Sequence, residues 1–205
     1  MEKEKVGNNH EILNKLFGTQ SKEENNMSEK LNIGIILGST REGRVSPAVG
    51  DWVKTIADQR DDANYEIVDI KDYQLPLLGE GDAPGIAKWN EKLAELDGFV
   101  FIVQEYNHSL SAALKNALDL AREAWHNKAA GIVSYGSTGG ARAAEHLRGI
   151  MGELMIADVR THPTLSLYYD FKGQEFVPQD LHLETVNLML DQVNAWSGAL
   201  KPLRK

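Results

Sequence analysis

The stretch Leu31-Asn-Ile-Gly-Ile-Ile-Leu-Gly-Ser-Thr-Arg-Glu-Gly-Arg-Val-Ser46, followed by Pro47, predicts a strand, a loop and the start of a helix. Residues 31–37 show no polar alternation, which is typical of a strand covered on both faces. Ser46 is a favoured N-cap residue, and Pro47 fits the first helical position, where a missing N–H costs nothing. We therefore expect a helix over residues 47–58, directly behind a buried strand.

The loop between this strand and this helix has the features of a phosphate site. A helix N-terminus presents free backbone N–H groups and a partial positive charge, and both attract phosphate. Ser39, Thr40 and Ser46 add hydroxyl donors, and Arg41 or Arg44 can neutralise charge. Gly, Ser and Thr are also ordinary turn residues, so the loop by itself leaves a functional and a purely structural interpretation open.

Two familiar phosphate motifs are absent from this loop. The dinucleotide fingerprint Gly-x-Gly-x-x-Gly fails at its second glycine, because Ser39 and Thr40 follow Gly38. The nucleoside-triphosphate loop has its glycine spacing at Gly38 and Gly43, but Arg44 and Val45 replace its Lys-Ser/Thr pair. Both classes of nucleotide-binding protein are therefore disfavoured.

Composition excludes several further classes. The 205 residues are 42% hydrophobic, enough for one substantial core. A net charge of −8 and a pI near 5.3 disfavour nonspecific binding to nucleic acid or an anionic membrane. The absence of cysteine excludes disulfides and thiolate chemistry and suits a cytoplasmic protein. The six histidines show no paired ligand spacing, so we expect no metal.

Two parts of the chain differ in composition. Residues 1–30 are rich in Lys, Glu and Asn and contain no Arg, and we expect them to form a flexible N-terminal extension. Residues 31–205 are expected to form one domain.

From Leu31 onward strands and helices alternate. We expect strands at 31–37, 65–70, 98–103 and 129–134, and a fifth within 155–167. We expect helices at 47–58, 86–96, 110–122, 141–154 and 183–196. This alternation predicts an α/β fold with a five-stranded parallel sheet and helices on both faces. The loops 38–46, 104–109 and 135–140 each follow a strand, so they should meet at the sheet edge where such folds bind ligands.

Large apolar side chains outside these loops are expected mostly in the core. Helical spacing places Trp52, Trp89, Trp196, Met151 and Met155 there.

Two other aromatic features are expected nearer the surface. Trp125 precedes a polar turn and is expected at a pocket rim or an oligomer contact. Residues 168–180 are unusually aromatic for a loop and suggest a lid or, preferably, a subunit interface.

Three motifs together resemble the NADPH-dependent FMN reductase family, which has a flavodoxin-like fold and includes quinone, azo-dye and chromate reductases. They are Gly38-Ser-Thr-Arg41 with Ser46, then Glu105-Tyr-Asn107 before Leu114-Lys-Asn-Ala-Leu-Asp119, and Gly136-Ser-Thr-Gly-Gly140. With the order of strands and helices, the resemblance covers about residues 31–195. One position departs from it, since Gln104 stands where the family commonly has proline.

The resemblance implies a flavodoxin-like three-layer sandwich that binds FMN and uses NADPH or NADH as co-substrate. It assigns the FMN phosphate to Ser39, Thr40, Arg41 and Ser46. It assigns the ring and ribityl region to Glu105, Tyr106 and Asn107, and the other ring edge to Ser137, Thr138, Gly139 and Gly140.

Four of these side chains carry more specific expectations. Tyr106 can support the ring or gate its open face, and His108 can touch the substrate. We expect Glu105 to contribute to the flavin site through its backbone and not through its carboxylate, because a carboxylate would repel a reduced, anionic flavin. Arg44 remains open between phosphate, NADPH and solvent.

The resulting expectation is an NAD(P)H-dependent oxidoreductase that passes hydride through flavin N5 to a quinone, an azo compound or free flavin. Family members are commonly homodimers or homotetramers, and neither nucleic acid nor membrane is an expected partner. Two other classes stay open: a flavodoxin-like carrier of electrons to protein partners, and a nucleotide-dependent phosphotransferase.

Overall fold

A parallel sheet forms the centre of the computed structural model, which describes residues 30–81 and 83–204. Its strands run in the order β2-β1-β3-β4-β5, with β6 also paired to β4. They are β1 (Leu31–Leu37), β2 (Ala63–Asp69), β3 (Gly98–Gln104), β4 (Lys128–Gly136), β5 (Ile156–Asp158) and β6 (Thr164–Ser166). The strand order reverses between β1 and β3, which places a crevice at their carboxyl ends. Apart from Lys30, the expected extension of residues 1–30 lies outside the described residues.

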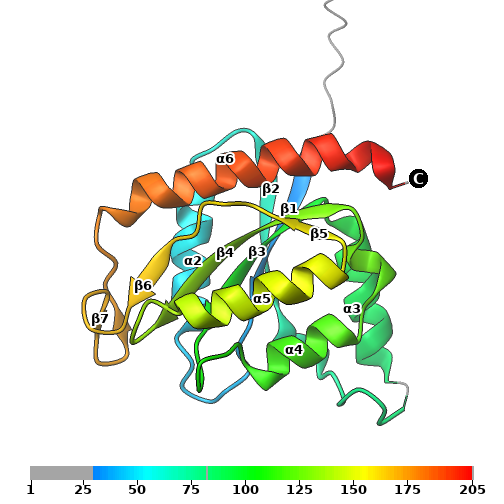
Figure 1. Ribbon diagram of the computed structural model, residues 1–205, viewed down its shortest axis with the longest axis horizontal. Coiled ribbons are helices and arrows are strands. Elements are labelled where there is room, and N and C mark those ends of the chain that lie inside the picture. The colour runs from blue at the N-terminus through cyan, green and yellow to red at the C-terminus, as the bar shows by residue number, and fades with distance from the viewer. Residues whose placement is uncertain (1–29, 82, 205) are drawn as a thin grey trace, which may run out of the picture.

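Helices cover both faces of this sheet (Figure 1). One face packs against α2 (Ser46–Ala57) and α6 (His182–Leu200), and the other against α3 (Pro84–Glu95), α4 (Ala112–Asp119) and α5 (Ala141–Glu153). The three-layer α/β architecture expected from the alternating pattern is confirmed. No helix in the ranges 30–81 and 83–204 combines the length and apolar character needed to cross a membrane.

Short elements complete the chain. Three 3₁₀ turns, η1 (Ile70–Tyr73), η2 (Glu123–Trp125) and η3 (Lys201–Leu203), are found among the described residues. The small hairpin of β7 (Phe171–Lys172) and β8 (Glu175–Phe176) lies in the aromatic segment expected as a loop.

Several element boundaries differ from expectation. The fifth strand is split into β5 and β6, both parallel to β4. Helix α4 begins only at Ala112, because the Ser111 hydroxyl accepts the Leu114 N–H (3.1 Å) and caps it. Strand β4 runs on through Tyr135 and Gly136, which were expected in the following loop.

The expected capping role of Ser46 is wrong. Helix α2 already includes Ser46, its N-cap is Val45, and no side chain caps it. The Ser46 hydroxyl is therefore not used to begin the helix, although Pro47 does lie in the first turn as expected.

Trp125 is a core residue, contrary to expectation. Its ring is fully buried, 4.9 Å from Phe99 and 5.8 Å from Trp89 between ring centroids. Its indole N–H donates to the Leu118 carbonyl (3.1 Å), so the one polar atom is satisfied inside the core. The polar turn after it therefore does not bring the indole to the surface.

Two expected core residues are instead exposed. Trp196 is 46% exposed, because α6 approaches β3 closely and places Ser197 over Gly98. Met155 is 51% exposed and follows α5 with a left-handed φ of 54°, which turns its side chain out of the helical stripe.

Candidate active site

Hydrogen bonds tie two of the expected loops together at the carboxyl edge of the sheet. The Gly38 carbonyl accepts from Gln104 Nε2 (2.7 Å) and from Ser111 Oγ (2.6 Å). The Gly38 N–H donates to the Ile102 carbonyl (3.0 Å). Gln104, which stands where the family commonly has proline, thus joins the end of β3 to the loop after β1.

A hollow of about 160 Å³ collects residues from all three loops and from the hairpin. Among the expected site residues, Arg41, Glu105 and Tyr106 line it. The segment 168–180, expected as a lid or, preferably, a subunit interface, contributes a further wall. Its lining residues there are Phe171, Gly173 and Gln174, and Leu167 lies directly before it.

Ser39 and Ser46 place two buried hydroxyls in and beside the first loop. Neither has a hydrogen-bond partner within the part of the chain that the structure describes. The Tyr135 side chain is close to the Ser46 hydroxyl, but the two do not meet hydrogen-bond geometry. A buried polar group without a partner costs about 1–3 kcal/mol, so these two, one in the loop after β1 and one at the start of α2, indicate a place for a ligand. Thr40 and Arg41 are exposed beside them.

Arg44 has a structural role in the first loop. Its guanidinium forms a bidentate ion pair with Asp69 at the end of β2, with Nη1 2.7 Å from Oδ1. The same Nη1 donates to the Ser39 carbonyl. The hydrogen bonds that Arg44 donates to Asp69 raise the pKa of Arg44 above its ordinary value. Arg44 therefore shapes the first loop and is not directed into solvent.

The second loop is a tight turn between Tyr106 and Ser109. Each residue's N–H donates to the other's carbonyl, at 2.9 and 3.0 Å. Asn107 and His108 both have positive φ, 49° and 68°, as in the turns that Asn favours. The turn leaves the Tyr106 ring 39% exposed, with the Arg41 guanidinium 6.0 Å from its centroid.

Glu105 uses its carboxylate as well as its backbone, which corrects the expectation for it. Its N–H donates to the Tyr135 carbonyl (3.0 Å) and links the second loop to β4. Its side chain is only 5% exposed and forms an ion pair with Arg142. Oε2 accepts the N–H groups of Arg142 (3.1 Å) and Ala143 (3.4 Å), so the carboxylate caps α5.

The charge of Glu105 is compensated within the protein. Burial alone would raise the pKa of Glu105, but the hydrogen bonds from Arg142 and Ala143 outweigh it and lower that pKa. The carboxylate is thus held against the helix N-terminus, where its negative charge is stabilised.

The third loop depends on two consecutive glycines with left-handed backbone. Gly139 and Gly140 have φ of 72° and 74°, and a Cβ on Gly140 would lie 2.8 Å from the Tyr135 nitrogen. Ser137 and Thr138 are exposed, and Thr138 Oγ1 accepts from Arg142 Nη2 (2.9 Å).

This loop also carries unused backbone donors. No acceptor for the N–H groups of Ser137, Thr138 and Gly140 is found in residues 30–81 and 83–204. They are therefore available to a ligand.

Arg142 connects the second and third loops, and the sequence prediction missed it. Besides Glu105 and Thr138, it contacts His108, with Nη1 2.7 Å from Nε2. His108 is therefore engaged with Arg142 at the loop edge. In the sequence, only its position two residues after Gly140 indicates that Arg142 belongs to the site. The sequence prediction also missed Asp69, for which the only indication is its position at the end of a strand.

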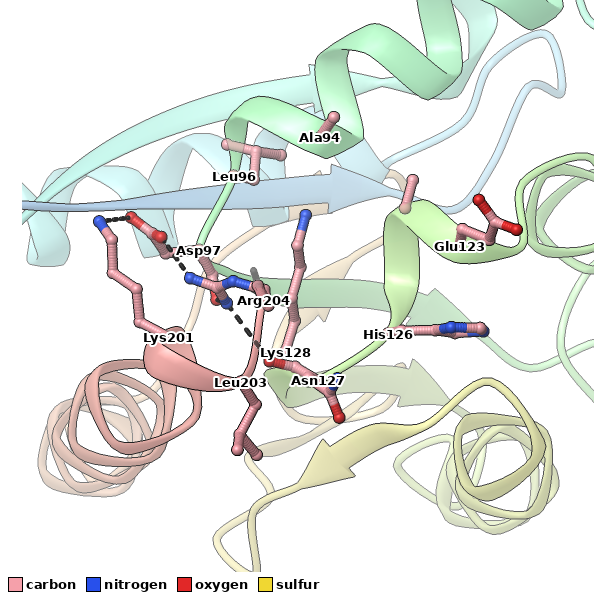
Figure 2. A pocket seen from close by; sticks show the side chains of 11 residues that line it. Ala94, Leu96, Asp97, Glu123, His126, Asn127, Lys128, Lys201, Leu203 and Arg204 are labelled. Carbon is pink, nitrogen blue, oxygen red and sulfur yellow. Dashed lines mark hydrogen bonds and ion pairs between the residues drawn. The ribbon is translucent and has the colours of Figure 1, made fainter.

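A second hollow, of about 490 Å³, lies at the amino-terminal edge of the sheet (Figure 2). There the Asp97 carboxylate pairs with Lys201 (3.1 Å) and Arg204, and Lys128 Nζ donates to the Leu93 carbonyl. Burial lowers the pKa of Lys128 to about 8. These charged groups already pair with one another or with the backbone. The hollow is therefore a weaker candidate for a ligand site than the three loops, where buried polar groups lack partners among the described residues.

No group of three or more His, Cys, Asp or Glu side chains with metal-binding geometry occurs among the residues that are described.

The strand order and the three loops at the switch point between β1 and β3 define a protein with a flavodoxin-like fold. The chain belongs to the NADPH-dependent FMN reductase family, whose model matches residues 31–170. It is an oxidoreductase that uses FMN and NAD(P)H.

Individual relatives agree with this assignment. The chain is 36% identical over 146 residues to an NAD(P)H-dependent FMN reductase of Schizosaccharomyces pombe, covering 66% of this chain and 73% of that protein. It is 34% identical over 134 residues to a quinone reductase of Escherichia coli K12, covering 61% and 71%. In structure it resembles FerB, an NAD(P)H:(acceptor) oxidoreductase from Paracoccus denitrificans, with a TM-score of 0.67, 18% identity, and 82% and 98% of the two chains covered. That likeness shows the fold.

Proposed function

We propose that the three loops hold FMN, with its phosphate on the first loop, and that the protein reduces quinones with NAD(P)H. The observation that carries this proposal is that the buried hydroxyls of Ser39 and Ser46 find no hydrogen-bond partner in residues 30–81 and 83–204. A phosphate bound at the start of α2 would accept from both and would meet the positive end of the helix. Thr40 and Arg41 are exposed at the same loop and would complete the contact.

The residues of the second and third loops would bind and orient the isoalloxazine ring of FMN. The free N–H groups of Ser137, Thr138 and Gly140 would donate to its polar edge, and the left-handed glycines allow the backbone to come close. Tyr106 and Asn107, on the tight turn, would border the ring face. Bound FMN would supply the chemistry of two-electron transfer between the nicotinamide and the acceptor.

Glu105 and Arg142 would keep this site electrostatically suitable for a reduced flavin. Because Arg142 and the start of α5 compensate the Glu105 carboxylate, its negative charge would not oppose the charge of the reduced ring. Arg41 and Arg142 add positive charge at the edges of the site.

A planar aromatic acceptor fits the walls of this site best. Tyr106, Leu167 and Phe171 present aromatic and apolar surface to the hollow. Relatives named FMN reductases and quinone reductases support flavin and quinone acceptors. An azo compound offers a similar planar shape. NAD(P)H and acceptor would use the same open ring face in turn, with Tyr106 as its gate and His108 at its edge.

Steady-state kinetics with NADPH and a benzoquinone test this proposal. We expect the purified protein to bind FMN and to give parallel double-reciprocal lines, because one ring face serves both substrates in turn. Failure to bind FMN after reconstitution would contradict the site, and intersecting lines would contradict the shared face.

We also propose that the protein is a homo-oligomer of the cytoplasm. An apolar groove of about 690 Å³ between α4 and α5, lined by Leu110, Ala112 and Ile150 among others, supports a contact between copies. The absence of cysteine supports a reducing compartment. Light scattering of the purified protein in solution tests the oligomeric state. Cell fractionation tests the cytoplasmic location.

A further inference from the structure

We propose that His162 is a positioning residue of the flavin site, which holds the turn of residues 136–140 through Ser134 so that its backbone N–H groups face FMN. This inference rests on the proposed placement of the third loop against the flavin. His162 lies between β5 and β6, outside the three motifs, and its ring is hydrogen-bonded to Ser134, which is not one of the expected site residues.

The geometry joins three groups in a row. Ser134, in β4, is fully buried, and its hydroxyl donates to the Gly139 carbonyl. His162 Nε2 lies 2.7 Å from the same Ser134 oxygen. The backbone secures this arrangement, since the Ser134 N–H donates to the Pro163 carbonyl (3.1 Å), next to His162.

The chemistry of the hydroxyl fixes the direction of both bonds. A serine hydroxyl has one hydrogen, and a carbonyl oxygen can only accept. Ser134 therefore gives its hydrogen to Gly139, and His162 must supply the hydrogen of its own contact from Nε2. In this tautomer the His162 Nε2–H group donates to a lone pair of the Ser134 oxygen. The Ser134 hydrogen then points toward the Gly139 carbonyl in the turn.

The bond to Gly139 sets the direction of the next N–H group. In a trans peptide the C=O and the following N–H point in opposite directions. With the Gly139 carbonyl aimed at β4, the Gly140 N–H points away from Ser134. The turn is closed by the Gly139 N–H, which donates to the Gly136 carbonyl (3.1 Å).

The surroundings keep His162 neutral, as this role requires. Burial and, to a smaller extent, the charge of Arg148 lower the pKa of His162 to about 4, although Glu145 opposes them. Both charged side chains come from α5, which packs beside β5. A neutral imidazole can serve as a donor at Nε2 without bringing a positive charge under the turn.

The test uses the full-length protein and two readouts. The first is the set of backbone amide shifts of Ser137, Thr138 and Gly140 in the flavin-free, ¹⁵N-labelled protein. The second is the two-electron midpoint potential of the FMN-loaded protein. The variants are His162→Leu, Ser134→Ala and His162→Gln, and His126→Leu is the matched control, a partly buried histidine at the opposite sheet edge.

We expect His162→Leu and Ser134→Ala to move the three amide shifts and to lower the midpoint potential by about 30 mV, which is a tenfold loss of preference for reduced FMN. The double variant that combines His162→Leu with Ser134→Ala should show no larger change in amide shifts or potential than either single variant, because both substitutions break the same chain of hydrogen bonds. His162→Gln, whose amide N–H can reach the Ser134 oxygen, should restore both readouts. His126→Leu should change neither.

Unchanged amide shifts and potential in both His162→Leu and Ser134→Ala would overturn the inference, as would an equal change in His126→Leu or no rescue by glutamine. If His162→Leu does not fold, Ser134→Ala and His162→Gln still decide it. Failure of the unmodified protein to bind FMN would contradict the proposed function, whereas the amide shifts would still show whether His162 shapes the turn.

Discussion

Arg44 and Asp69 form a bidentate ion pair that joins the loop after β1 to the end of β2, with side chains only 13% and 14% exposed. Because Arg44 also donates to the Ser39 carbonyl, the pair fixes the backbone next to one of the two free hydroxyls. We expect Asp69→Asn to lower the free energy of unfolding by about 2 kcal/mol, since it leaves a mostly buried guanidinium without its charge partner.

The same variant should weaken FMN binding about tenfold, because the first loop loses its support. Urea unfolding and fluorescence titration with FMN measure the two effects. Asp58→Asn is the matched control: its pair with Lys54 is exposed and contributes less than about 0.5 kcal/mol. Equal results for the two variants would show that Arg44 does not depend on Asp69.

The Glu105 carboxylate stabilises the start of α5, and Glu105→Gln tests this. We expect a loss of about 1–2 kcal/mol in unfolding free energy, because the amide keeps the size of the side chain but loses the ion pair with Arg142 and most of its interaction with the helix dipole. Since the pKa of Glu105 is lowered on folding, this contribution is present at neutral pH. It disappears as the pH falls below the ordinary Glu pKa of about 4.3.

Glu145→Gln is the matched control for this prediction. Glu145 lies on the same helix, and its pair with Arg148 is exposed, so we expect a change below about 0.5 kcal/mol. A Glu105→Gln variant as stable as this control at pH 7 would rule out the capping role.

His162 predicts a pH dependence of stability. Its pKa is about 4 in the folded protein, against 6.5 when unperturbed, so the unfolded chain binds more protons between these values. The unfolding free energy should therefore rise as the pH increases from 4 to 6.5, by about 2 kcal/mol from this side chain after allowance for its partial exposure.

The variant His162→Gln isolates this titration, because it keeps an N–H donor but cannot be protonated. We expect urea unfolding at several pH values to show a flatter profile in the variant than in the unmodified protein. Parallel profiles over pH 4 to 6.5 would mean that His162 is protonated as easily in the folded state as in the unfolded one.

Local patterns predict most of this fold, and their successes have a common origin. The mostly apolar runs of 31–37 and 98–103 correspond to β1 and β3, because a strand buried on both faces tolerates few polar residues. Loops that follow such strands must reach the same sheet edge, so the place of the site follows from the order of the elements.

The missed features depend on contacts between distant segments. Whether Trp125 is buried is decided by Trp89 and Phe99, which pack against it from other elements. Trp196 is exposed because Ser197 fits over Gly98, a close approach that the helical stripe does not reveal.

The same limit applies to the site. Its charge partners, Arg44 with Asp69 and Glu105 with Arg142, lie 25 and 37 residues apart in sequence, so no motif spacing indicates them.

The central claim is that the buried hydroxyls of Ser39 and Ser46 receive the phosphate of FMN, and a comparison of FMN with riboflavin in Ser46→Ala tests it most directly. Riboflavin has the same ring and ribityl chain but no phosphate. We predict that the dissociation constant for FMN rises 10- to 100-fold, roughly the value of one hydrogen bond to a charged group, while that for riboflavin stays the same. The flavin-free variant should be at least as stable as the unmodified protein, because the hydroxyl that it loses is buried and has no partner among the described residues. An unchanged dissociation constant for FMN, or an equal loss for both flavins, would contradict the claim.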